Sequence, residues 1–555
     1  MKYIYFILLI ILNTSVIAQP ICQWAYIPVG PAQSYNTIYN VTTDHSGNII
    51  EVGKLLGIAD MDPGTGMADT SFSSMTYNYY ISKTTNSGQL LWVQYFQNNS
   101  QIAFFEFMGL KINSANEIIV VGNFFGMVDF DLSASGVDTL RSHFPTYPDY
   151  FVAKYDSAGN HQWAFNIGDP STSNIEVQSV TIMQNDNIVV AANPNGTVDV
   201  DPDTSVVHNS IGGNANLICY DTNGNYLWNN NIVPVYSYSV NNNSIDGDAA
   251  GNSYLASVGY YELTMNKFDN TGLNVWNKTI GEFSAGARVD PQSLLVDKAT
   301  SEFYVAGTFG GTVDFDPGVL VVNKISSSGF FQDGFIAKYD QDMNLIWVNT
   351  YVGNTLFGNY SLDFDSANIV AVGQYKGTID FGGGYIFSSP STFSPFYIKI
   401  NSSGSTLEGY SLSGPGSYNT INVVSNQIFV TCGNITSNTD MDPTPATLML
   451  STTTSNFFTA VYNVPVTSAL NDFPGSSDVV SVFPNPALDI LNLKFSANYI
   501  GKEYFIVDIL GNKVQQGIIV GERTIIDLKS LSFGIYFIRL NDDPNTGIKF
   551  IKGVN

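Results

Sequence analysis

The sequence predicts an all-β protein in which a seven-bladed β-propeller is followed by a small Ig-like β-sandwich. Three observations support this prediction: six tryptophans recur within similar phrases, short strand patterns lie between them, and the pattern changes after residue 463. A chain of 555 residues is also too long for one hydrophobic core, because cores stop growing at roughly 250 to 300 residues. Two or more folding units are therefore expected.

The tryptophans mark the repeat of the body. A phrase that begins with an aromatic residue and Asp, continues through a turn and ends in Trp occupies 155–163, 220–228, 268–276 and 339–347. A further copy begins at Ile400, and Leu407 takes the place of its tryptophan. With these copies the repeat has seven starts, which carry Trp24, Trp92, Trp163, Trp228, Trp276, Trp347 and Leu407.

Four strand signals recur in the same order within a unit, each rich in β-branched and aromatic residues. The first contains the tryptophan, the second is an apolar run such as 117–122, the third begins Gly-Thr-Val-Asp, and the fourth is Phe-x-Ala-Lys-Tyr, as at 151–155. Four strands in each of seven units indicate a β-propeller, because radial repetition hides sheet edges. A β-solenoid would need shorter coils. The unit between Trp228 and Trp276 lacks the third signal, which predicts one short blade.

The repeat resembles that of the secreted bacterial seven-bladed beta-propeller family. The shared series is Val-Asp-Phe-Asp-Pro-Gly, Phe-Ile-Ala-Lys-Tyr-Asp and Gly-Asn-x-x-Trp, and the resemblance covers residues 24–463. It implies the fold of the body. It does not imply a function, because propellers bind, scaffold and catalyse.

The N-terminus has the features of an export signal. Lys2 precedes an apolar run from Ile4 to Leu12, and small residues end at Ala18 before Gln19. We predict a signal peptide at 1–18 that is cleaved between Ala18 and Gln19. The run is shorter than the roughly 20 residues that span a bilayer, so no transmembrane segment is expected in the mature chain. The sequence before Cys22 does not favour a lipid anchor on this cysteine.

A linker and a second module follow the predicted body at 19–463. Residues 464–477 contain prolines and a Gly-Ser-Ser stretch, which predicts an exposed connector. Residues 478–555 contain short alternating strands, which suit a small β-sandwich. An ordinary Ig-like binding domain is one interpretation of this module.

The motif order of 478–555 resembles the C-terminal sorting domain of the type IX, or Por, secretion system of Bacteroidetes. The matching positions are Pro484, Asn485, Pro486, Asp508, Gly511, Gly534, Tyr536, Lys549 and Lys552. This resemblance implies that the outer-membrane secretion machinery is a partner. It also implies a protein that is secreted or held at the outer cell surface.

Charge and cysteine content restrict the partners and the covalent structure. From Asp478 onward there are eight basic and eight acidic residues, so the net charge of −25 belongs to the part before it. Such a surface disfavours nucleic acid, which binds basic residues. Three cysteines allow at most one disulfide. A Cys22–Cys432 bond would close a ring, and three buried thiols including Cys219 are the alternative.

Paired carboxylates are the main chemical resource of the body. The four histidines form no zinc pattern, and there is no nucleophile elbow or phosphate loop. An Asp-x-Asp pair places two carboxylates on one face of an extended segment, where they could hold calcium. Aspartates beside a proline turn also commonly accept hydrogen bonds from their own backbone, which is the structural alternative. The candidate calcium ligands are Asp60, Asp62, Asp129, Asp131, Asp199, Asp201, Asp314, Asp316, Asp440 and Asp442.

These patterns favour a binding or adhesion module that acts outside the cell on a glycan or protein ligand. The alternative is an extracellular carbohydrate-active enzyme, a glycan lyase or hydrolase that uses carboxylates found once in the ring. Repetition of the Asp-x-Asp pairs counts against a catalytic role, because a catalytic residue should occur once. No catalytic residue is assigned, and calcium is the one candidate cofactor.

Overall fold

The computed structural model describes 20–463 and 481–552 with gaps. The gaps are 29–35, 57–58, 65–76, 97–101, 134, 145–146, 171–174, 211–214, 233–243, 260–261, 282–286, 328–332, 353–355, 413, 426–427, 445–446, 453–455, 484–486, 488, 495–499, 509–511, 522, 533 and 541–547. The chain divides into two compact units, Met1–Pro465 and Val466–Asn555. The predicted signal peptide 1–18 with its cleavage site at Ala18 and Gln19, the linker 464–477, and Pro484, Asn485, Pro486 and Gly511 lie outside the described residues. In the described part, no helix has the length and apolar character needed to cross a membrane.

Antiparallel sheets of four strands, here called blades, follow one another along the first unit. Blade 1 contains β2 (Asn36–Thr43), β3 (Ile49–Leu56), β4 (Tyr77–Thr84) and β5 (Leu90–Phe96). Blade 2 contains β6 (Ile102–Ile112), β7 (Ile118–Asp129), β9 (Asp149–Tyr155) and β10 (His161–Ile167), with β8 (Thr139–Arg141) added beside β7. Blade 3 contains β11 (Ile175–Ile182), β12 (Ile188–Pro194), β13 (Asn216–Tyr220) and β14 (Tyr226–Asn231). Blade 4 contains β15 (Ile245–Gly247), β16 (Ser253–Val258), β17 (Leu263–Phe268) and β18 (Asn274–Ile280).

Three further four-stranded sheets complete the described part of the body. Blade 5 contains β19 (Arg288–Val296), β20 (Phe303–Gly310), β23 (Asp333–Tyr339) and β24 (Leu345–Tyr351). Blade 6 contains β25 (Leu356–Asp365), β26 (Asn368–Asp380), β27 (Ile386–Ile400) and β28 (Thr406–Ser411). Blade 7 contains β29 (Gly416–Ser425), β30 (Ile428–Ile435), β33 (Asn456–Asn463) and β1 (Ile21–Tyr26). Small hairpins pair β21 (Thr312–Asp314) with β22 (Asn323–Ile325), and β31 (Thr439–Asp440) with β32 (Met449–Leu450).

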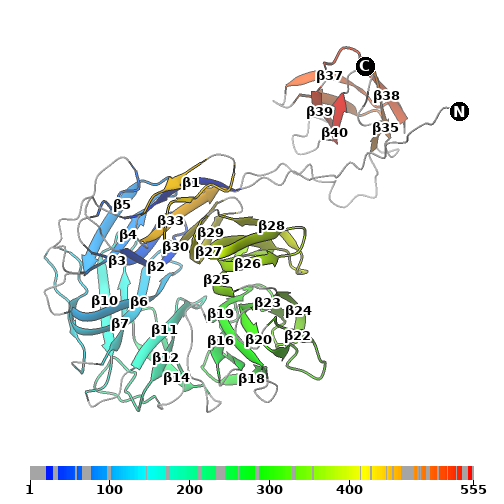
Figure 1. Cartoon of the computed structure of the whole chain (residues 1–555). Coiled ribbons are helices and arrows are strands. Elements are labelled where there is room, and N and C mark those ends of the chain that lie inside the picture. Colours follow the sequence, from blue (N-terminus) through cyan, green and yellow to red (C-terminus); the bar gives the residue numbers. More distant parts are fainter. Residues whose placement is uncertain are drawn as a thin grey trace. The chain divides into compact units, whose positions relative to one another are not determined.

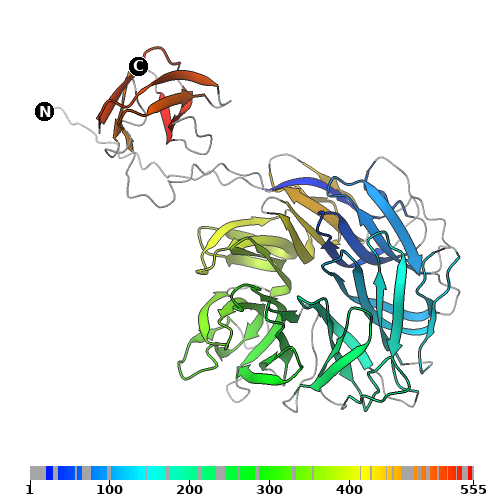
Figure 2. The same ribbon diagram turned by 180° about the vertical axis from the view of Figure 1, so that it is seen from behind.

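The blades form a closed ring. The first strand of each blade contacts the first strand of the next, in the cycle β2, β6, β11, β15, β19, β25, β29 and back to β2. Figures 1 and 2 show the sheets arranged around a common centre. The N-terminal strand β1 is the outer strand of blade 7 and pairs with β33 from Ile21↔Asn463 to Tyr26↔Thr459. The two ends of the body therefore share one sheet, and the fold is a β-propeller.

The structure corrects the predicted order of strands within a blade. The Gly-Thr-Val-Asp segments do not form a separate main strand: at 312–314 the segment belongs to the side hairpin β21–β22, and at 377–380 its equivalent extends β26. The missing strand is the innermost one, such as β6, which sequence analysis did not identify. The innermost strands carry no phrase that recurs between blades, so the repeat did not mark them.

Apolar clusters between neighbouring blades form the core of the body. One cluster joins Val52 and Ile81 of blade 1 to Val120 and Phe151 of blade 2, and similar clusters lie at other blade boundaries. Middle strands are consequently buried on both faces, and every residue of β9 and β23 is buried. This explains why these strands read as continuous apolar runs.

Trp24, Trp276 and Trp347 each connect their blade to the next one through an indole hydrogen bond. The Trp24 indole N–H donates to the Asn86 carbonyl (2.9 Å), and the Trp347 indole donates to the Ser402 carbonyl (3.0 Å). Both acceptors lie in the turn between the last two strands of the following blade. The turn glycine leaves room for the ring: a Cβ on Gly404, whose φ is +89°, would lie 3.0 Å from Trp347. The recurring Asp-x-x-Gly-Asn-x-x-Trp phrase thus provides a turn that receives the tryptophan of the preceding blade, and a tryptophan that packs on the turn of the following blade.

A buried carboxylate joins blade 7 to blade 1 at the closure. Glu51 of β3 accepts hydrogen bonds from Tyr80 of β4 (2.5 Å), from Thr459 of β33, and from Tyr26 of β1 (3.4 Å). Burial raises the pKa of Glu51, while these hydroxyl donors act to lower it. The equivalent strand positions in blades 2 and 3 are Val120 and Val190. Glu51 is thus a charged residue at a position that valine occupies in blades 2 and 3.

Cys22, Cys219 and Cys432 are buried free thiols. Cys22 is paired with Tyr462 across the sheet, whereas Cys432 is paired with Thr459. The two cysteines of blade 7 therefore lie on different rungs, and the ring closes through β1 without a disulfide.

The second unit consists of two small sheets. One contains β34 (Ser481–Phe483), β35 (Ile490–Lys494) and β38 (Arg523–Asp527); the other contains β37 (Lys513–Ile518), β36 (Glu503–Val507), β39 (Gly534–Leu540) and β40 (Ile548–Lys552). Leu491, Ile506 and Ile538 belong to the apolar cluster between them. This is the predicted β-sandwich.

Candidate functional site

The Asp-x-Asp pairs form turns that bind their own backbone. In blade 5, Asp314 Oδ1 accepts from the amides of Asp316 (3.1 Å) and Val322 (2.8 Å), and Asp316 Oδ1 accepts from the amide of Gly318 (2.7 Å). The pairs at Asp60 and Asp62, Asp129 and Asp131, Asp199 and Asp201, and Asp440 and Asp442 repeat this pattern. Each pair lies in its own blade. Within the described residues, no group of three or more Asp, Glu, His or Cys side chains could hold a metal ion.

The residue between the two aspartates is apolar and packs into the core. Phe130, Val200, Phe315 and Met441 are fully buried, and each carbonyl accepts a hydrogen bond from the tyrosine of Phe-x-Ala-Lys-Tyr or its equivalent. The donors are Tyr155 (3.0 Å), Tyr220 (2.9 Å), Tyr339 (3.0 Å) and Tyr462 (2.9 Å). These four apolar residues belong to the clusters between blades, where the sheets diverge toward the outside of the ring. These contacts account for the repeated turn, and calcium binding stays a prediction.

Blade 6 departs from this pattern in two ways. Its turn contains Asp380, Phe381 and Gly382, so glycine replaces the second aspartate, and Ile400 replaces the tyrosine. The Phe381 carbonyl instead accepts a hydrogen bond from the Thr406 hydroxyl (2.5 Å). Three consecutive glycines, 382 to 384, have positive φ. The turn therefore keeps a buried apolar residue, Phe381, but lacks the side chain of the second aspartate.

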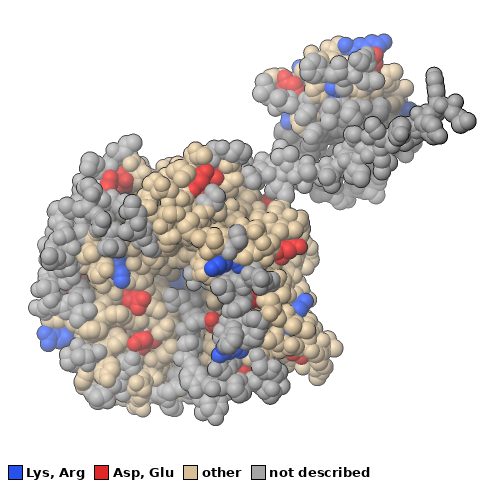
Figure 3. Space-filling model, in the orientation of Figure 1, with Lys and Arg blue, Asp and Glu red and all other residues tan. Residues whose placement is uncertain are grey.

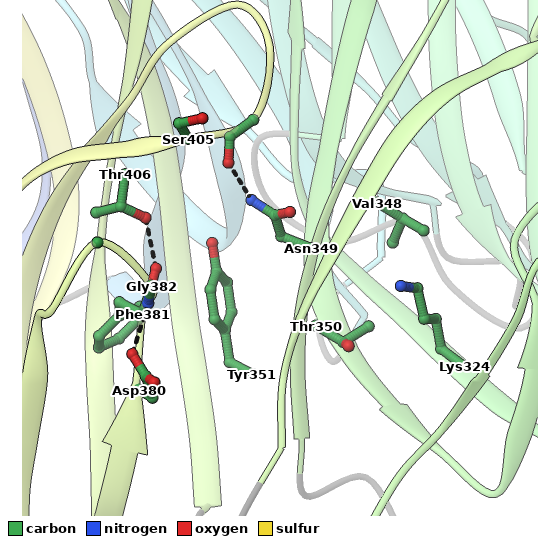
Figure 4. A pocket seen from close by; sticks show the side chains of 12 residues that line it. Lys324, Val348, Asn349, Thr350, Tyr351, Asp380, Phe381, Gly382, Ser405 and Thr406 are labelled. Carbon is green, nitrogen blue, oxygen red and sulfur yellow. Dashed lines mark hydrogen bonds between the residues drawn. The ribbon is translucent and has the colours of Figure 1, made fainter.

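A pocket lies at this departure, between blade 6 and the outer strand β24 of blade 5. Its volume is about 560 Å³, within the roughly 300–1,000 Å³ typical of small-molecule sites. The blade 5 wall contains Lys324 of β22 with Asn349 and Thr350 of β24. The blade 6 wall contains Asp380 and Thr406, which Figure 4 shows on the other side of Tyr351 from Lys324.

Polar groups dominate the pocket, and the apolar groups near it are buried. Tyr351 and Phe381 are each about 2% exposed and their rings lie 5.0 Å apart, so they form the floor. Asp380 Oδ1 accepts from the Gly382 amide (2.8 Å), and Asn349 Nδ2 donates to the Gly404 carbonyl (2.6 Å). Within the described part of the chain, Asp380 Oδ2, Lys324 Nζ and the Thr350 hydroxyl have no hydrogen-bond partner. These groups are available to a ligand.

A second charged cluster lies at the centre of the ring. Asp246 accepts from the amide of Val296 (2.9 Å) and from Lys298 Nζ (2.6 Å), and Asp363 accepts from the amide of Val423 (2.6 Å). Burial raises the pKa of Asp363 to about 6, and burial lowers the pKa of Lys111. Because these carboxylates bind the backbone of the following blade, they stabilise the ring.

Sequence analysis did not identify the pocket residues, although two signals pointed to them. The loss of the second aspartate at Gly382 and of the tyrosine at Ile400 are visible in the sequence. Departures of this kind become informative once the repeated contacts are known. Outside such sites, charged side chains form small separate patches on the face of the body in Figure 3.

The sorting-motif residues within the described part form contacts or strands inside the second unit. Tyr536 is buried, and its hydroxyl donates to the Ser532 carbonyl (2.9 Å). Lys552 Nζ lies 3.2 Å from the Asp489 carboxylate. Asp508 accepts from the backbone and side-chain amides of Asn512, Gly534 begins β39, and Lys549 lies in β40.

Solved structures with low similarity match the body. A protein of unknown function from Dyadobacter fermentans has a TM-score of 0.36 and 9% identity, over 80% of this chain and 98% of that chain. The Dos1 propeller has a TM-score of 0.40 and 9% identity, over 80% and 96%. A protein of unknown function from Bacteroides caccae has a TM-score of 0.25 and 11% identity, over 49% and 89%. No curated protein matches the chain, and the fold assignment rests on the sheets described above.

Residues 481–552 match the family model described as "Secretion system C-terminal sorting domain". This match covers the sheets of the second unit and the described motif residues. A sorting domain of this kind implies interaction with the type IX secretion machinery. The chain is therefore a β-propeller protein with a type IX C-terminal sorting domain, exported to the cell surface or the extracellular space.

Proposed function

We propose that the propeller is an extracellular binding module and that the pocket between blades 5 and 6 holds its ligand, a glycan or a segment of a protein. The observation that carries this proposal is the position of the pocket. It lies where blade 6 has Gly382 and Ile400 in place of the second aspartate and the tyrosine that blades 2, 3, 5 and 7 share. A pocket of small-molecule size on which a few polar groups converge is the default candidate for a binding site.

Binding is favoured over the alternative of a carbohydrate-active enzyme. Glycoside hydrolysis commonly uses two carboxyl groups about 5 to 9.5 Å apart. Among the described lining residues, Asp380 is the one carboxylate. The cation on the opposite wall, Lys324, is suited to hold an oxygen atom of a ligand.

A binding panel tests the proposal. The full chain, expressed without residues 1–18, is applied to immobilised extracellular polysaccharides and proteins, and soluble products are measured in parallel. Thr350→Trp fills the pocket from β24. Saturable binding that Thr350→Trp abolishes, without product release, supports the proposal. Product release, or binding that this substitution leaves unchanged, contradicts it.

A further inference from the structure

We infer that the pocket takes the end of an uncharged saccharide; this inference rests on the proposed function. The groups available to a ligand are a carboxylate oxygen of Asp380, the Lys324 ammonium and the Thr350 hydroxyl. They accept, donate, and do both, respectively. A ligand that contacts all three groups needs both donors and acceptors.

Hydroxyl groups meet this requirement because each one both donates and accepts. A sugar hydroxyl can donate to Asp380 Oδ2 while another accepts from Lys324 Nζ, and both bonds are strengthened by the protein charge. An isolated anion would match Lys324 but would be repelled by Asp380. An apolar side chain would find polar walls, since the rings of Tyr351 and Phe381 that form the floor are each only about 2% exposed.

The charge of the body argues for an uncharged ligand. The part before Asp478 carries the whole net charge of −25, which repels polyanions such as uronic-acid or sulfated polymers. Uncharged polysaccharides are unaffected by this field. Selectivity against acidic glycans then arises from the body, and orientation in the pocket arises from Lys324 and Asp380.

The turn geometry provides matched variants. Asp380→Asn removes the charge but keeps Oδ1, which accepts from the Gly382 amide. Asp440→Asn makes the same change in blade 7, where Oδ1 accepts from the amides of Asp442 and Leu448. Lys324→Met removes the opposite charge and keeps most of the length of the unbranched side chain. Each pocket variant removes one charge-assisted hydrogen bond to the ligand, so it should weaken binding about tenfold or more.

The test measures calorimetric affinities of the full chain for neutral oligosaccharides of glucose, galactose, mannose and N-acetylglucosamine, and for oligogalacturonate. Binding of a neutral sugar that weakens at least tenfold in Asp380→Asn and Lys324→Met, but not in Asp440→Asn, supports the inference. Pocket-dependent binding confined to oligogalacturonate or to proteins overturns the inference and leaves the proposed function intact. Sugar binding that survives Thr350→Trp overturns both. Circular dichroism of each variant establishes that it is folded.

Discussion

Glu51 offers a direct test of how the ring is closed. We consider Glu51→Val, because valine occupies the equivalent position in blades 2 and 3. The substitution removes the acceptor of three hydroxyl groups, of which Tyr80 and Thr459 are fully buried. The bond from Tyr26 is the longest of those with a stated length, at 3.4 Å, and is left out of the sum.

The magnitude follows from the two buried hydroxyls. A buried group that loses its partner costs about 1–3 kcal/mol, so two such groups cost about 2–6 kcal/mol. Removal of the carboxylate relieves the desolvation that raises its pKa, which offsets part of this cost. We therefore expect Glu51→Val to lower the free energy of unfolding by about 2–4 kcal/mol.

The assay is urea unfolding at pH 7, followed by tryptophan fluorescence. The triple variant Glu51→Val, Tyr80→Phe, Thr459→Val removes the donors as well as the acceptor. It should recover most of the stability, because replacing both partners by apolar groups of similar shape is nearly neutral. A single variant with unchanged stability, or a triple variant no more stable than the single one, would refute the reasoning.

Three further predictions concern the repeated turns. Gly404→Ala should lower the free energy of unfolding by about 1–3 kcal/mol more than Gly384→Ala, measured by urea denaturation. Both glycines have φ near +90°, but only a Cβ on Gly404 would meet a tryptophan, at 3.0 Å. Equal effects would contradict the packing of the tryptophan against this turn. Burial alone would raise the pKa of Asp156 and Asp340, but hydrogen bonds from Asn160, Asn344 and backbone amides lower it below 3.8. The stability that these carboxylates contribute is therefore present above pH 3.8 and is lost as the pH falls through the lower pKa of the folded state. Asp340→Asn should flatten the decline of the urea midpoint between pH 4 and 2, and an unchanged slope would count against this contribution. Addition of a chelator should leave the thermal midpoint unchanged, since backbone amides occupy Oδ1 of the paired aspartates. A fall of the midpoint with chelator that added calcium reverses would contradict this prediction.

The all-β class, the propeller and the C-terminal sandwich could be predicted because repeats expose their own pattern. Val120, Phe151 and Trp163 are apolar and recur in the same order, so burial in a repeated blade follows from the sequence. The structural interpretation of Asp314 as a turn residue agrees with its hydrogen bonds to the backbone.

The innermost strands and the pocket could not be predicted in the same way. The strand β6 has a sequence that is not repeated, and Lys111 within it meets charges from other blades rather than a fixed partner. The pocket depends on the space left between Thr350 and Gly382, which belong to different blades. Such distances depend on the radial divergence of the sheets, a property of the closed ring and not of any one repeat.

The pairing of Ile21 with Asn463 sets the order in which the body can assemble. During synthesis β1 emerges first, but its partner β33 emerges after the main strands of the other blades have been made. Closing so long a loop adds an entropic barrier that grows with the logarithm of its length. Until that moment, blade 7 lacks its outer strand and Glu51 lacks two of its three donors. A chain truncated before β33 would remain unsealed, so closure of the ring distinguishes a finished body from an unfinished one.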